Sequence, residues 1–266
     1  WLLKFNQFSN MDHPGEAIDR ALSILRRKPI DGYEIYLDQG SHFNVESKDE
    51  KVDTFGVSYS WGMAFRILKG HRIGFSYTTF SSPSPFDHRN FLGSLGQITE
   101  DAIASAEATS LDPCYDFAPP LEAPPPQLPI FDGTLEGTSE KTKIEKAICL
   151  EEAARSVDPT RISKVRNAAY QEAVSRKTLI NSNRLQFSFA STVSSVSVTA
   201  VAEISGESEV GWEFDVSHFL RDLDVEKVGQ EAGRKALEQL GGKRIRSGVY
   251  PVLVRNSVAS EFLSLL

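Results

Sequence analysis

The sequence is poor in several residue types and patterns, and each shortage excludes a class of protein. It has only two cysteines, Cys114 and Cys149, which are too few for a disulfide framework and fit a reducing compartment. No apolar run is long enough to span a bilayer, so we expect no membrane partner. No signal peptide is visible, although the chain begins at Trp1 and not at a methionine. We therefore expect a cytoplasmic protein.

Basic residues are fewer than acidic ones: the sequence has 29 lysines and arginines and 36 aspartates and glutamates, which gives a net charge of −7. A protein that binds phosphate backbones needs a basic face, so we expect no nucleic-acid partner. The two short basic runs are Arg26–Lys28 and Lys243–Arg246. Each follows a helical pattern, where cations complement the negative end of the helix dipole.

Complete catalytic motifs are missing as well. No H-E-x-x-H pattern, Walker A sequence or G-x-G-x-x-G occurs, and no two histidines lie at metal-ligand spacing. We interpret the five histidines as structural or solvent-facing: His13, His42, His71, His88 and His218. The sequence thus predicts no catalytic, cofactor-binding or metal-binding residue in this chain.

Three weaker candidates remain, and each has a simpler interpretation. Cys114 lies among prolines without a nearby histidine, so it lacks the base that activates a thiol. Glu50 and the pair Glu151-Glu152 are interpreted as solvated charges. The Ser/Thr-rich strand Ser188–Thr199 could be an edge that accepts a peptide strand. We prefer to interpret it as a strand half exposed to water.

The main positive feature is a repeated pattern. Trp61–Ala108 and Ser197–Leu240 each show strand, tight turn, strand, connector and helix, with turn glycines at Gly70 and Gly206. This pattern predicts an α+β fold of two related α/β units, each with antiparallel strands and flanking helices.

Local periodicity places the elements of the first unit. Asp12 and Pro14 open a helix, which Pro29 stops. A strand at Tyr33–Leu37 is followed by a hairpin partner at 43–46 and by the clearest strand of the chain at 57–67. A helix at Arg89–Ala108 completes the unit.

The second unit is predicted in the same way. Helices are expected near Ser139–Ser156 and Val225–Leu240, the latter capped by Gly241-Gly242. Strands are expected at Val165–Ser175 and Lys177–Ile180, and a change of hydrophobic phase at Ser194-Ser195 predicts a bulge. A further strand at Val249–Val254 and an apolar helix from Ala259 end the chain.

These patterns divide the chain into five regions. We predict an N-terminal extension (residues 1–11), a first αβ unit (12–111), a Pro-rich linker (112–136), a second αβ unit (137–248) and the start of a truncated C-terminal domain (249–266). The seven prolines between Asp112 and Gly133 make the linker extended and semi-rigid. The apolar end helix should expose an apolar patch or bury it against a second copy of the chain.

Three segments carry a resemblance to a known family. They are GMAFRILKGHRIGFSYTTF (62–80), QLPIFDG (127–133) and VEKVGQEAGRKALEQLGGKRIRSGVYPVLV with the following VASEFLSLL (225–254 and 258–266). In this order and spacing the chain resembles the TldD/PmbA family, with the PmbA/TldE branch the more similar one. The resemblance covers nearly all of the chain from Asp12 onward.

The resemblance implies a bacterial or archaeal modulator of DNA gyrase that works in peptide proteolysis. TldD and TldE together form a zinc-dependent peptidase that acts on a microcin precursor and in an antitoxin system. A TldD-like subunit, in a heterodimer, and a peptide substrate are therefore the expected partners.

The zinc motif of the TldD branch, H-E-x-x-x-H, is replaced in this sequence. An ungapped match puts Glu261 and Leu266 at the histidine positions and Phe262 at the glutamate. We therefore expect a non-catalytic subunit, with zinc only in the TldD-type partner. Two alternatives stay open: a stand-alone protein-interaction module, and an autonomous metallopeptidase completed by residues outside this sequence.

Overall fold

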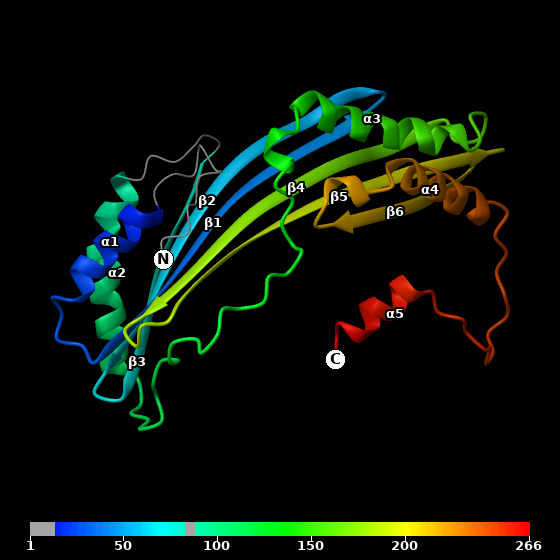
Figure 1. Ribbon diagram of the computed structural model, residues 1–266. Helices are drawn as coiled ribbons and strands as arrows, with labels where there is room; N and C mark the ends of the chain where they lie inside the picture. Colours follow the sequence, from blue (N-terminus) through cyan, green and yellow to red (C-terminus); the bar gives the residue numbers. More distant parts are fainter. Residues whose placement is uncertain (1–13, 83–88) are drawn as a thin grey trace.

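The computed structural model describes residues 14–82 and 89–266, which form one α+β fold around a six-stranded antiparallel sheet (Figure 1). The strands are β1 (Gly32–Lys48), β2 (Lys51–Lys69), β3 (Arg72–Ser82), β4 (Lys164–Asn181), β5 (Gln186–Ile204) and β6 (Glu207–Ser217). Their order in the sheet is β3-β2-β1-β4-β5-β6. Each half of the chain thus contributes three strands, and the β1–β4 ladder joins them into one sheet.

Helices cover one face of this sheet. Four of them do so, namely α1 (Pro14–Leu25), α2 (Arg89–Ala108), α3 (Glu140–Ser156) and α4 (Val225–Gln239), whereas α5 (Asn256–Leu263) has no buried residue and stands apart from the sheet (Figure 1). Short 3-10 turns lie at η1 (Leu135–Gly137) and η2 (Leu220–Asp222). Helices α1 and α2 cover the first half, and α3 and α4 cover the second, on the convex side of the curved strands (Figure 1). None of the described helices is both long and apolar enough to span a bilayer.

Alternation along the strands explains this one-sided packing. In β2, Trp61, Met63, Phe65 and Ile67 are buried, whereas the residues between them face away from the helices. Two cores result, one between α1, α2 and strands β1 and β2, the other between α3, α4 and strands β1, β4 and β5. The opposite face of the sheet stays open, and it carries the candidate site.

The four helices predicted before residue 241 and the hairpin turns at Gly70 and Gly206 are confirmed, whereas the helix expected from Ala259 begins at Asn256 and ends at Leu263. The helix at Arg89–Ala108 has the predicted bounds, and α3 begins after Ser139, whose hydroxyl accepts a hydrogen bond from the Thr142 amide at 3.1 Å. Gly70, Gly206 and Gly241 have positive φ angles of 57°, 87° and 74°, as turns and a helix end require. The expected cap Asp12 lies outside the described residues.

Several strand predictions are wrong, because the strands are longer than local patterns indicated. The segment at 43–46 is no hairpin partner of Tyr33–Leu37, since both belong to the continuous strand β1. The predicted strands Val165–Ser175 and Lys177–Ile180 are likewise one strand, β4. Strands that lie inside the sheet are paired on both sides, so polar residues interrupt their pattern without ending them.

The predicted bulge at Ser194-Ser195 is absent, because β5 pairs there with β4 and β6 in unbroken register. The phase changes because polar Thr192 and Ser194 occupy the buried face, next to apolar Val196. The predicted strand Val249–Val254 is also wrong. No ladder forms there in the described chain, and Val249 and Leu253 are almost fully exposed.

The two halves make the same close contact between helix and edge strand. A Cβ on Gly74 of β3 would lie 2.0 Å from the Ala102 carbonyl oxygen of α2, and one on Gly211 of β6 would lie 2.1 Å from that of Ala232 in α4. Only glycine permits such an approach. The same helices hydrogen-bond the edges: Ser105 accepts from the Phe75 amide of β3 at 3.3 Å. Helix α4 thus repeats the position of α2.

Candidate functional site

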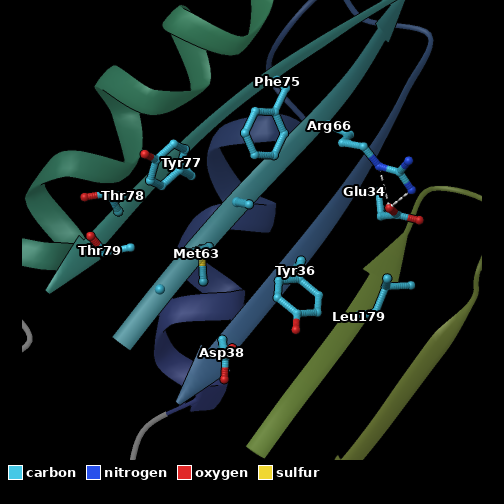
Figure 2. A pocket seen from close by; sticks show the side chains of 12 residues that line it. Glu34, Tyr36, Asp38, Met63, Arg66, Phe75, Tyr77, Thr78, Thr79 and Leu179 are labelled. Carbon is cyan, nitrogen blue, oxygen red and sulfur yellow. Dashed lines mark hydrogen bonds and ion pairs between the residues drawn. The ribbon is translucent and has the colours of Figure 1, made fainter. Parts of the chain in front are cut away.

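The open face of the sheet contains a groove of about 580 Å³ over β1, β2, β3 and β4 (Figure 2). It is lined by Glu34, Tyr36, Asp38, Gly62, Met63, Ala64, Arg66, Phe75, Tyr77, Thr78, Thr79 and Leu179. Its floor is low because Gly62 and Ala64 lie in the middle of β2, between larger side chains on the neighbouring strands. We call this the open-face groove.

Aromatic side chains form one wall of the open-face groove. Phe75 and Tyr77 alternate along β3 and project from it together, with ring centroids 5.8 Å apart (Figure 2). They are 52% and 62% exposed, which is unusual for such large rings. Tyr36 lies across the groove on β1 (Figure 2). The groove therefore offers aromatic surface that no described residue covers.

Two ion pairs border the groove. Arg66 Nε donates to Glu34 Oε1 at 2.7 Å, and its guanidinium lies 5.8 Å from the centre of the Phe117 ring. Lys177 Nζ donates to Asp38 Oδ2 at 2.7 Å. The hydrogen bond to Asp38, with a further contribution from Tyr36, raises the pKa of Lys177. These paired charges orient one another and leave the groove close to neutral.

This geometry suits the binding of a ligand. Shallow grooves that combine aromatic walls with a few placed polar groups bind the side chains of ligands. The groove has no histidine or cysteine. Within residues 14–82 and 89–266, no three His, Cys, Asp or Glu side chains come close enough to hold a metal ion.

The structure does not gather the histidines into a site. His71 lies in the β2–β3 turn with φ 57°. The His218 ring Nδ1 lies 2.6 Å from the Thr192 carbonyl oxygen, so it holds backbone in place. His42 is exposed on β1, and His13 and His88 lie outside the described residues. No shared partner connects the three described histidines.

The two cysteines lie in different surroundings. Cys114 is exposed in the Pro-rich segment. Burial raises the pKa of the Cys149 thiol, and the nearby carboxylates of Glu226 and Glu152 raise it further. A raised thiol pKa lowers the fraction of thiolate, which is the reactive form.

The interpretation of Glu151 as a solvated charge is wrong, because its side chain is fully buried. Its Oε2 accepts from Ser47 Oγ at 2.8 Å and from the Glu50 amide at 3.0 Å, and its Oε1 lies 2.7 Å from Arg155. Asp49 and Glu50 both have positive φ, so the carboxylate ties α3 to a tight hairpin turn. Glu151 therefore has a structural role.

The sequence pattern does not indicate a buried polar network that the structure contains. Lys143 of α3 forms an ion pair with Glu172 of β4, and the Tyr170 hydroxyl donates to the same carboxylate. The Lys143 ammonium also lies 4.8 Å from the centre of the Phe43 ring. Burial, followed by the bond to Glu172, raises the pKa of Tyr170. A lysine in a helix otherwise rich in exposed charges gives no signal of such burial.

Asp132, at the end of the Pro-rich segment, is also a buried carboxylate. Burial alone would raise its pKa, but hydrogen bonds from Thr134 and from the Leu220 amide at 3.0 Å outweigh burial, and its pKa is lowered. Its own amide donates to Thr192 Oγ1 at 2.8 Å. Asp132 thus fastens the segment to β5 and to the turn before α4.

The remaining candidate residues from the sequence do not line the open-face groove. The part of Ser188–Thr199 from Ser194 onward is paired on both sides, with β4 and β6, so it is no edge. Glu261 and Phe262 lie on α5, which has no buried residue, and Leu266 is fully exposed. Among the described residues, no group of three His, Cys, Asp or Glu side chains could hold a metal ion in place of the missing H-E-x-x-x-H motif.

Comparison with known proteins identifies relatives over most of the chain. Two family models match: domain 1 of the PmbA/TldA metallopeptidases at residues 33–106, and their central domain at residues 133–240. Metalloprotease PmbA of Escherichia coli O157:H7 is 25% identical over 248 residues, which are 92% of this chain and 52% of that protein. The chain thus spans about half the length of this curated relative.

Solved structures share the fold. A candidate modulator of a DNA gyrase from Thermotoga maritima superposes with a TM-score of 0.70 at 19% identity, over 88% of this chain and 50% of that one. TldE from Thermococcus kodakarensis gives a TM-score of 0.65 at 17% identity, over 84% of this chain and 46% of its own. Both matches cover the two halves of the sheet together.

Proposed function

The chain belongs to the PmbA/TldD family, and we propose that it acts as a PmbA/TldE-like, non-catalytic part of a TldD/TldE-type peptidase system. In this proposal a TldD-type subunit binds the zinc and cleaves the peptide. The present chain contributes binding surface and forms a heterodimer with that subunit in the cytoplasm. By resemblance, the peptides belong to microcin maturation, antitoxin degradation or gyrase modulation.

The observation that carries the proposal is the chemistry of Glu261, Phe262 and Leu266. Phenylalanine and leucine have no atom that binds zinc or removes a proton from water. The open-face groove supports a binding role, because its aromatic wall can hold side chains of a peptide. The matched contacts of α2 and α4 support a further proposal, that the two halves arose by internal duplication.

A reconstitution assay tests the proposal. A TldD-type subunit from the same source is incubated with an unstructured peptide alone, then with the present chain, and the present chain is also tested alone with added zinc. We expect cleavage to be fastest in the mixture and absent with the present chain alone. Cleavage by the chain alone would establish instead the alternative of an autonomous metallopeptidase.

The second candidate function is an interaction module without a role in proteolysis, which the uncovered aromatic wall also favours. The double variant Phe75→Ser/Tyr77→Ser distinguishes the two functions. In a peptidase subunit it should slow cleavage in the mixture while the chain stays folded. If cleavage is the same with and without the present chain, the interaction module is the better description.

A further inference from the structure

Strand β5 extends beyond β6, and its first part has a neighbour on one side only. It pairs with β4 from Gln186 onward, but its ladder with β6 begins at Ser194. We call Gln186–Val193 the β5 half-edge. An unpaired stretch of this length normally requires a cover, because it offers backbone donors and acceptors to any passing strand.

The hydrogen bonds of Thr192 show which backbone groups face this half-edge. Its amide donates to the Ile130 carbonyl at 2.9 Å, and its carbonyl oxygen lies 2.6 Å from His218 Nδ1, so both groups point away from β4. Backbone groups of alternate residues in a strand point the same way. Register is unbroken here, so the groups of Ser188 and Ala190 face outward too. Among the described residues neither has a backbone partner on that side.

The Pro-rich segment is fastened at both ends of this half-edge, and between these ends no described residue of the segment forms a backbone hydrogen bond with β5. Asn181 Nδ2 donates to the Ala118 carbonyl at 2.9 Å at one end, and Ile130 bonds Thr192 at the other. All residues of 118–129 are exposed, and Figure 1 shows the segment looping out below the strands. As extended polyproline chain it would measure about 37 Å, against about 24 Å along β5 from Leu185 to Thr192. The segment is therefore too long to lie straight along the half-edge.

We infer that the β5 half-edge binds an extended peptide, which adds to the sheet as a strand beside Ser188 and Ala190. Ile130 already makes the first bond of such a strand, so it marks the line along which the peptide continues. On the open face the peptide would meet Phe187 and Phe189, whose ring centroids are 5.5 Å apart. Such neighbours favour β-branched or aromatic side chains at alternate positions of the peptide.

The inference rests on the proposed function in one respect: that function supplies the ligand, which is a peptide held for cleavage. Binding and cleavage are therefore tested separately. The probe is an end-capped heptapeptide of alternating valine and threonine, and affinity is measured by calorimetry on the full chain. Amide hydrogen exchange then locates the peptide, with protection expected at Ser188 and Ala190.

Two variants at one position test the backbone contact. Ala190→Pro removes the outward amide and leaves the ladder to β4 intact, since proline is tolerated where the missing N–H faces no strand. It should weaken peptide binding about tenfold, the value of one or two backbone hydrogen bonds. Ala190→Val keeps the amide and should bind as the unchanged chain does. If the proline variant unfolds, a peptide N-methylated at alternate residues, tested on the unchanged chain, should show the same loss.

Equal binding by the proline variant would overturn the inference. So would protection in β2 before Tyr59, where the ladder to β3 begins, in place of protection in β5. Concentration-dependent dimerisation that Ala190→Pro abolishes, without peptide binding, would also overturn it and assign the half-edge to a second copy. Peptide binding without any effect of the chain on cleavage would support the half-edge and refute the proposed function.

Discussion

Replacing Lys143 by methionine should destabilise the protein more than replacing Lys143 and Glu172 together. Both side chains are 9% exposed. The other close partner of the Glu172 carboxylate is the Tyr170 hydroxyl, which donates a hydrogen bond to it. Removing the ammonium leaves an uncompensated buried carboxylate, which costs about 3–5 kcal/mol. For a domain of this size, that loss lowers the thermal midpoint by roughly 6–20 °C.

The double variant Lys143→Met/Glu172→Leu removes both charges and leaves only the Tyr170 hydroxyl without its acceptor. That costs about 1–3 kcal/mol. Adding Tyr170→Phe should restore most of the remaining loss, because a buried polar group replaced by apolar atoms is close to neutral.

Urea denaturation followed by circular dichroism measures these differences, provided that the transition is two-state. Lys141→Met is the matched control, because Lys141 forms an exposed pair with Glu145 at 3.8 Å on the same helix. It should change the free energy of unfolding by less than about 0.5 kcal/mol. A double variant less stable than Lys143→Met would refute the reasoning, because the charges would then contribute more than their burial costs.

Three further predictions concern the close approach at Gly211, the buried carboxylate of Asp132 and the zinc content of the chain. Gly211→Ala should cost at least about 1–3 kcal/mol in chemical denaturation, because its Cβ would lie 2.3 Å from the Ala236 amide nitrogen, whereas Gly93→Ala, where nothing lies within 4 Å, should be neutral or stabilising. Asp132 has a lowered pKa, so its contribution to stability is complete above the ordinary aspartate value of 3.8 and is lost as pH falls through its folded value. Asp132→Asn should therefore flatten the acid limb of a plot of unfolding free energy against pH. Elemental analysis of the dialysed chain should give well under one zinc per molecule, and about one would contradict the assignment of zinc to the partner.

Local pattern was enough to predict much of this fold. The helix Arg89–Ala108, the turns at Gly70 and Gly206 and the long apolar face of β2 all depend on residues close together in sequence. The continuity of β1 and β4 depends instead on pairing between the two halves. That pairing leaves no trace in either segment alone, so the local pattern predicts an end to each strand at its polar residues.

The candidate site was harder to predict for the same reason. The open-face groove combines Phe75, Arg66, Tyr36 and Leu179 from four strands, and nothing in the spacing of these residues indicates that they meet. From local sequence, Glu151 and Lys143 cannot be told from the exposed charges of the same helix. Only the packing of α3 over the sheet removes them from water.

The position of β1 has a consequence for how the protein is made. Its β4 partner leaves the ribosome roughly 130 residues later, which at 5–20 residues per second is a delay of about 7–26 s. During that time the β1 edge formed by Gly32–Lys48 has no native neighbour beyond β2. A strand edge that waits so long invites wrong partners. The interval between the synthesis of β1 and of β4, and any chaperone that shields this edge, would therefore affect how much of the chain folds correctly.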